Sequence, residues 1–158
     1  MNIYPKVTAQ FTSDKMNGCT PLVVLFTNKS INADSYSWIF GDGSTAASTN
    51  ISHAYNNPTN GVMQESVQLI ATSNFGCSDT SNLSLISIYP RSKADFSMSN
   101  QAGCSPLTVQ FLNQSGNATI YTWNITNSKA SSGNDDLIQT FNNNSTSNQN
   151  RTITLIAN

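Results

Sequence analysis

The stretch Gly18–Asn28 reads GCTPLVVLFTN, and its counterpart Gly103–Asn113 reads GCSPLTVQFLN, 85 residues further along the chain. In the first stretch Leu22, Val24 and Phe26 occupy every second position, and apolar residues do the same in the second. An alternation with a period of two predicts a β-strand with one buried face. A repeat of this length exceeds a solenoid unit of ~20–50 residues. We therefore interpret it as a small domain used twice.

Further rows of alternating apolar residues extend this pattern over most of the chain. Three positions of the first copy recur in the second: Tyr36, Trp38 and Phe40 match Tyr121, Trp123 and Ile125. About seven short strands per copy, with a turn every ~8–12 residues, are typical of an antiparallel β-sandwich. The sequence thus predicts an all-β chain of two tandem sandwiches, residues 1–90 and 91–158.

The composition excludes several classes of partner. Charged residues make up 9% of the chain, against a usual ~25%, so we expect neither a nucleic-acid interface nor a charged membrane-binding face. Asn, Ser and Thr supply 22, 23 and 17 of the 158 residues. We predict no membrane span, because no stretch approaches ~20 apolar residues. Met1–Pro5 lacks the apolar core of a signal peptide, and we interpret Met1 as a start added to an excised piece.

The second copy is shorter than the first. The first copy continues through a turn and a cysteine, Asn74–Thr80, into one more strand, and the pattern of the second copy reaches only Asn158. Two explanations stay open: this piece of the protein stops before the last strand, or a neighbouring chain supplies it. A sandwich without that strand exposes an unpaired edge that invites strand addition.

The segment Trp38–Ser44, WIFGDGS, resembles the WDFGDGS signature of PKD (polycystic kidney disease) domains. Ser52–Tyr55 is similar to the H-x-Y motif of that family, and Val67–Thr72 resembles its V-x-L-x-V-T strand. In the second copy Trp123–Ser128 lacks both glycine and aspartate, so this copy resembles a degenerate PKD domain. The resemblance implies immunoglobulin-like β-sandwiches in tandem on extracellular proteins. The composition and cysteines resemble PKD repeats of long cell-surface proteins in Bacteroidota.

We interpret the motif residues as structural: Trp38, Phe40, Gly41, Asp42, Gly43, His53, Tyr55 and Trp123. The tryptophans supply large buried surfaces. The two glycines permit positive φ on either side of Asp42, whose carboxylate can accept backbone N–H bonds across the turn. The alternative for Asp42 is a calcium ligand, although calcium prefers six to eight oxygens. We therefore predict no cofactor and no metal, with calcium as the alternative.

No catalytic residues are predicted. His53 is the only histidine, and catalysis would require a nucleophile and an orienting acid beside it. We expect a buried, hydrogen-bonded structural histidine and no enzymatic activity. The acidic pair Asp135-Asp136 lies in a Ser/Gly/Asn-rich stretch, which we interpret as a solvated loop.

The three cysteines point to an oxidising compartment. Cys19 and Cys77 flank the first copy, and Cys104 repeats Cys19. Such periodic cysteines favour a disulfide over a metal site, which needs more ligands in closer spacing. We favour a Cys19–Cys77 bridge within the first domain, with Cys104 unpaired. The alternative is that cysteines link adjacent domains.

Together these observations predict a non-enzymatic, secreted or cell-surface module. It would act as a stiff spacer or stalk in a large surface protein such as an adhesin, including those used in gliding. Its partners would be neighbouring repeats of the same chain, and surface polysaccharide or protein. The alternative is a carbohydrate- or protein-binding accessory module of a secreted hydrolase or protease.

Overall fold

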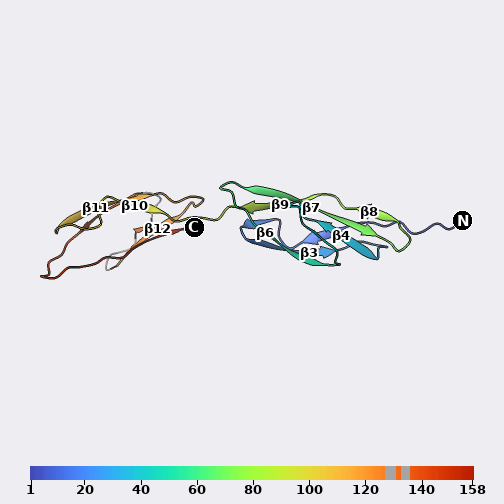
Figure 1. The fold of residues 1–158 in the computed structure, drawn as a ribbon, viewed down its shortest axis with the longest axis horizontal. Coiled ribbons are helices and arrows are strands. Elements are labelled where there is room, and N and C mark those ends of the chain that lie inside the picture. Colours follow the sequence, from blue (N-terminus) through green and yellow to red (C-terminus); the bar gives the residue numbers. More distant parts are fainter. Residues whose placement is uncertain (127–130, 133–135) are drawn as a thin grey trace. The chain divides into compact units, whose positions relative to one another are not determined.

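A computed structural model describes residues 1–126, 131–132 and 136–158 (Figure 1). The chain divides into two compact units, Met1–Arg91 and Ser92–Asn158. Every regular element in the described part of the chain is a β-strand, which confirms the predicted all-β class. The described residues contain no helix long and apolar enough to cross a membrane.

Unit 1 contains nine strands: β1 (Phe11–Ser13), β2 (Asn17–Cys19), β3 (Leu22–Asn28), β4 (Ser35–Ile39), β5 (Thr45–Ala46), β6 (Ile51–Tyr55), β7 (Met63–Thr72), β8 (Ser78–Thr80) and β9 (Ser84–Tyr89). One sheet has the order β1-β3-β6, and the other has the order β2-β9-β7-β4-β5 with β8 paired to β7. Most pairs are antiparallel, but β2 runs parallel to β9, with Cys19 opposite Tyr89. The long strand β7 pairs with β9 along its first half and with β4 and β8 along its second.

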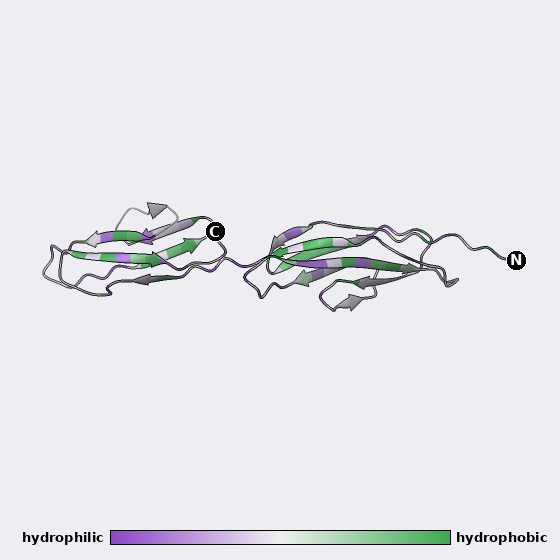
Figure 2. Ribbon diagram, turned by 90° about the horizontal axis from the view of Figure 1, so that it is seen from above, coloured by the Kyte–Doolittle hydropathy of each residue, from purple (hydrophilic) through white to green (hydrophobic). Residues whose placement is uncertain are grey.

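The core of unit 1 lies between its two sheets. Leu22, Val24 and Phe26 point inward from β3 and are buried, whereas Val23 and Leu25 between them are exposed. Strands coloured by hydropathy show the same alternation of hydrophobic and hydrophilic residues (Figure 2). Inward residues of β4, β7 and β9 complete the cluster from the other sheet: Trp38, Val67, Leu69, Ile86 and Ile88.

The described residues of unit 2 form six strands: β10 (Phe96–Met98), β11 (Leu107–Asn113), β12 (Tyr121–Ile125), β13 (Ser131–Ser132), β14 (Leu137–Phe141) and β15 (Ile153–Ala157). They form two three-stranded sheets in the orders β10-β11-β14 and β13-β12-β15. Val109, Phe111, Trp123 and Leu155 are the buried centre of this unit.

Several contacts of unit 1 recur in unit 2 with nearly the same geometry. The rings of Phe11 and Trp38 lie 5.2 Å apart at 72°, and those of Phe96 and Trp123 lie 5.1 Å apart at 75°. The Tyr36 hydroxyl donates to the carbonyl three residues earlier, as does the hydroxyl of Tyr121, both at 2.9 Å. The sequence repeat is therefore accompanied by a repeat of side-chain packing.

Candidate functional site

The glycine-rich turn after β4 carries a cluster of polar side-chain contacts in unit 1. Phe40 N–H donates to the Ser44 carbonyl at 3.2 Å and closes the turn. Gly41 and Gly43 both have a φ of +88°, a region that side chains with a Cβ rarely adopt. Gly41 is also crowded, because a Cβ there would lie 2.7 Å from the backbone nitrogen of Ser66. At Gly43 nothing lies within 4 Å.

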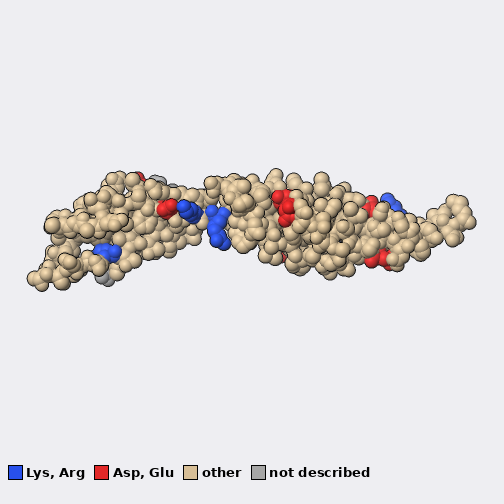
Figure 3. All heavy atoms as spheres, in the orientation of Figure 1, with Lys and Arg blue, Asp and Glu red and all other residues tan. Residues whose placement is uncertain are grey.

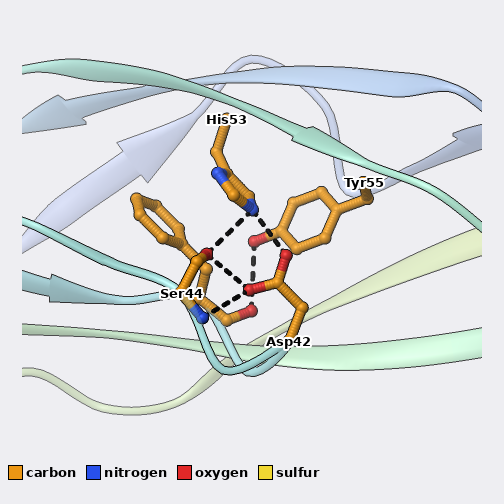
Figure 4. Close-up of polar contacts among 5 residues, drawn as sticks. Asp42, Ser44, His53 and Tyr55 are labelled. Carbon is orange, nitrogen blue, oxygen red and sulfur yellow. Dashed lines mark hydrogen bonds and ion pairs between the residues drawn. The ribbon is translucent and has the colours of Figure 1, made fainter.

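Asp42 uses one carboxylate oxygen within the turn and the other to connect the turn to β6 (Figure 4). Oδ1 accepts from the Ser44 N–H at 3.0 Å and from the Ser44 hydroxyl at 2.5 Å. Oδ2 lies 2.7 Å from His53 Nε2. Burial opposes ionisation of Asp42, but the hydrogen bonds from Ser44 and His53 outweigh it and hold the pKa of this carboxyl below its ordinary value.

Aromatic rings enclose the other side of His53. Its imidazole is stacked on Phe40, with ring centroids 4.0 Å apart and planes 7° apart, and it meets the edge of Tyr55 at 4.6 Å. The Tyr55 hydroxyl donates to the Phe40 carbonyl at 3.3 Å, and burial raises the pKa of Tyr55. His53 keeps 18% of its side-chain surface exposed, so it is partly buried.

The Asp42, Ser44 and His53 side chains do not form a nucleophilic triad. In such a triad the acid holds one ring nitrogen of histidine while the other nitrogen accepts the serine proton. Here Asp42 and Ser44 both face the same nitrogen, His53 Nε2, at 2.7 and 3.3 Å. Because an ionised carboxylate only accepts, Nε2 donates to Asp42, and the Ser44 proton is also directed to Asp42. The arrangement can fix a turn, but it cannot activate a hydroxyl.

The pKa of Asp42 predicts an acid-sensitive turn. A carboxyl whose pKa is lower when folded than when unfolded contributes stability above its ordinary pKa of about 4. That contribution is lost as the pH falls through the folded pKa, because the proton binds the unfolded chain first. We expect the urea concentration at the unfolding midpoint of unit 1 to decrease at pH values below 4. In Asp42→Asn this decrease in stability should be smaller.

Asp79→Asn serves as the control variant, because Asp79 is a second carboxyl among the described residues whose pKa is lowered. Asp79 accepts from the backbone N–H of Ala9 at 2.8 Å and also from Thr80 N–H. Asp79 lies away from the glycine-rich turn. Asp79→Asn should therefore keep the part of the stability decrease at low pH that is due to Asp42. An unchanged pH profile in Asp42→Asn would contradict the assignment.

Both predicted core tryptophans lie inside their units. Trp38 has no exposed surface and donates from Nε1 to the Ser48 carbonyl at 2.8 Å. Trp123 is 2% exposed and contacts Phe96 and Phe111. The segment that follows β12 in place of the glycine-rich turn lies partly outside the described residues, as does Asp135 of the predicted acidic loop.

The structure contradicts the predicted Cys19–Cys77 disulfide. All three cysteines are free, with Cys19 and Cys104 exposed and Cys77 partly buried. Cys19 pairs with Tyr89 at the end of β9, beside the beginning of β7, whereas Cys77 lies in the turn after the end of β7. The ten residues of β7 span roughly 30 Å, and a disulfide needs Cα atoms within about 7 Å. The two thiols therefore lie at opposite ends of one sheet.

A structural asparagine was missed by the sequence analysis. Asn57 is 7% exposed, and its side-chain amide donates to the carbonyls of Gly61 and Ile88, both at 2.7 Å. It thereby ties the loop after β6 to β9. The available signal was the motif Asn57-x-Thr59, which recurs as Asn143-x-Ser145.

Metal ligands are not grouped in the part of the chain that the structure describes. No three His, Cys, Asp or Glu side chains come together there to hold an ion. Asp42, the residue weighed as a calcium ligand, has both oxygens engaged by Ser44 and His53.

A comparison with known protein families finds a match that includes the glycine-rich turn. Residues 2–87 match the model of the PKD domain. The chain belongs to the PKD domain family. Within the PKD match lie the glycine-rich turn, His53 and Tyr55. No curated protein matches the sequence.

Solved structures similar to the chain include two PKD domains. The PKD1 domain from the Vibrio cholerae metalloprotease PrtV is 27% identical, with a TM-score of 0.45 over 54% of this chain and 99% of that chain. The PKD1 domain of Vibrio anguillarum Epp is 22% identical, with a TM-score of 0.46 over 56% and 100%. A structure described as carbohydrate-binding modules from the β-sandwich superfamily is 14% identical, with a TM-score of 0.50 over 99% and 86%. The last likeness shows the β-sandwich fold.

Proposed function

We propose that this chain is a non-catalytic, extracellular structural module, in which tandem PKD-type sandwiches act as a stiff spacer within a cell-surface protein. The observation that carries the proposal is the recurrence of the same core contacts in both units. Repeated self-contained cores suit a protein that sets distances between its other parts. The second unit is a divergent copy, since its glycine-rich turn is replaced.

The polar cluster supports this proposal because its groups are engaged with one another. Asp42, Ser44 and His53 hold the turn and leave no activated nucleophile. The surface offers few charges for a polyanionic or membrane partner: on the face in Figure 3, lysine, arginine, aspartate and glutamate side chains are few and scattered.

The short linker between the two units supports the proposal of a stiff spacer. The last strand of unit 1 ends at Tyr89, and Lys93 already pairs with Gly116 in unit 2. Pro90, whose φ is fixed by its ring, lies in the short segment between them. A linker of this length and composition restricts the motion of one domain relative to the next.

The spacer proposal can be tested with thiols that the chain already carries. Cys19 and Cys104 are exposed, one in each unit, so both accept spin labels once Cys77→Ser removes the third thiol. We expect electron–electron distance measurements to give one narrow distribution, because a short proline-containing linker allows few conformations.

The matched control inserts Gly-Ser-Gly-Ser after Pro90, which should broaden the distribution without changing either unit. A broad distribution in the chain without the insertion would overturn the spacer proposal. The folded state of each unit is monitored in parallel by the near-ultraviolet circular dichroism of its tryptophan.

A further inference from the structure

The loop after β6, residues 57–61, recurs after β14 as residues 143–147 with nearly the same hydrogen bonds. The Asn57 amide donates to the Gly61 carbonyl at 2.7 Å, and the Asn143 amide donates to the Ser147 carbonyl at 2.8 Å. In both loops the hydroxyl two residues after the asparagine lies 2.7 Å from its Oδ1 and 3.0 Å from that carbonyl. The two loops therefore share one hydrogen-bond pattern.

The sequences of the two loops differ at the two positions that end them. Asn60-Gly61 of unit 1 is replaced by Thr146-Ser147 in unit 2. Since both pairs support the same hydrogen bonds, this conformation does not depend on an asparagine followed by a glycine. The φ of Gly61 lies outside the left-handed region, and a Cβ added there would meet nothing within 4 Å. Neither the conformation nor the space at position 61 therefore requires a glycine.

An Asn-Gly pair has a chemistry that Thr-Ser lacks. The backbone nitrogen that follows an asparagine can attack the side-chain amide carbon, and a glycine obstructs this attack least because it has no Cβ. The N–Cγ bond forms, the Cγ–Nδ2 bond breaks, and ammonia leaves with the proton of the glycine nitrogen. Water then opens the succinimide ring at either carbonyl, which yields aspartate or isoaspartate. Water is the only co-reactant, and nothing is oxidised or reduced.

The surroundings of Asn60 leave both reacting groups available. Residues 58–62 are exposed. Among the described residues, the Asn60 side chain has no hydrogen-bond partner that would hold it away from the next residue. The Gly61 N–H donates to the Thr59 hydroxyl at 3.3 Å, which is long for a hydrogen bond. The attacking nitrogen is thus weakly held, although the carbonyl of the same residue is fixed by Asn57.

A second Asn-Gly pair lies in a strand. Asn17-Gly18 belongs to β2 and pairs with Ser87 and Ile88 of β9. Ring closure draws the glycine nitrogen towards the asparagine side chain, so at this place it would distort the β2–β9 ladder. A Cβ at Gly18 would also lie 2.6 Å from Leu22 Cδ1, so packing favours glycine there. The same dipeptide thus has a structural explanation in β2 that is missing in the loop.

We propose that Asn60-Gly61 is a self-modification site, at which Asn60 converts to aspartate and isoaspartate in the folded protein. Both products add a carboxylate to the loop, and isoaspartate also adds a methylene group to the main chain. The Gly61 carbonyl then moves relative to the Asn57 amide, which joins it to the Ile88 carbonyl of β9. Conversion therefore loosens the loop from β9 and lowers the stability of unit 1.

Incubation of the full chain in mildly alkaline buffer, followed by peptide mapping with mass spectrometry, tests the proposal. Replacement of the amide NH2 by OH raises the peptide mass, and chromatography separates the aspartyl from the isoaspartyl peptide. We expect conversion at position 60 and an intact Asn17. Gly61→Ala is the matched control variant, because the loop has space for the methyl group. It should fold like the parent and slow conversion by about tenfold, which a rise of ~1.4 kcal/mol in the barrier produces.

The same incubation in urea shows what the fold contributes, since Asn17 and Asn60 should convert at similar rates in the unfolded chain. In the folded chain, equal conversion at both positions would overturn the proposal, as would an Asn60 that converts only in urea or in neither condition. After conversion, unit 1 should unfold at a lower urea concentration, and unit 2 and Gly61→Ala should show no such shift. A converted protein with an unchanged unit 1 midpoint would contradict the proposed loosening of the loop.

Discussion

Trp38→Ala is expected to unfold unit 1. The indole has no exposed surface, packs against Phe11, Phe26 and Phe40, and donates a hydrogen bond to the Ser48 carbonyl. Truncation of a buried tryptophan costs about 3–5 kcal/mol, and the stability of a whole domain is of the order of 5–15 kcal/mol. For a unit of this small size the loss approaches the total. Urea titration followed by near-ultraviolet circular dichroism measures it.

Trp123→Ala is the matched variant in unit 2, with nearly the same aromatic contacts. It should remove the transition of unit 2 and leave that of unit 1. A Trp38→Ala protein that keeps its cooperative transition within about 1 kcal/mol of the parent would show that the core does not depend on this ring.

Gly41→Ala should destabilise unit 1 strongly, for two independent reasons. At a φ of +88° any Cβ is strained, at a cost of about 1–2 kcal/mol. The added methyl would also lie 2.7 Å from the Ser66 nitrogen and 2.8 Å from its carbonyl oxygen. Because these are backbone atoms of β7, the strand or the turn must move, and we expect a total cost of about 3 kcal/mol or more.

Gly43→Ala separates the two causes, because Gly43 has the same φ and nothing lies within 4 Å of the position that its added methyl would take. It should cost only the backbone strain, about 1–2 kcal/mol. Chemical denaturation of both variants gives the comparison. Equal losses of stability in the two variants would mean that the close contact between the turn and β7 adds nothing to the cost of Gly41→Ala.

The fold class could be predicted because its signal is local. Alternation along Leu22–Phe26 and its repeat fixes which side chains face inward, and β3 and β11 follow it residue by residue. The conformation of the turn could also be predicted, since glycines at 41 and 43 imply positive φ. The stacking of His53 on Phe40 could not be predicted, because these two residues, thirteen positions apart, meet only after β4 and β6 have formed parts of different sheets.

The disulfide prediction was wrong because two cysteines that flank a domain in the sequence need not lie at the same end of the folded domain. Cys19 and Cys77 are separated by the full length of β7, which the sequence does not reveal until the register of β9 is known. The difference in burial between Leu22 and Leu107 depends on tertiary structure in the same way. A partly buried Leu107 looks identical to a buried Leu22 in the sequence, and only the strand that covers one of them distinguishes the two.

The parallel pairing of β2 with β9 has a mechanical consequence. The chain leaves unit 1 directly from β9, which is held on one side by β2 and on the other by β7. A pull on the chain beyond Tyr89 acts along β9 and loads its ladder hydrogen bonds in shear, so several must break together. Peeling from a sheet edge would break them one at a time. Asn57, which donates to the Ile88 carbonyl, adds a side-chain bond to the ladder that resists the pull.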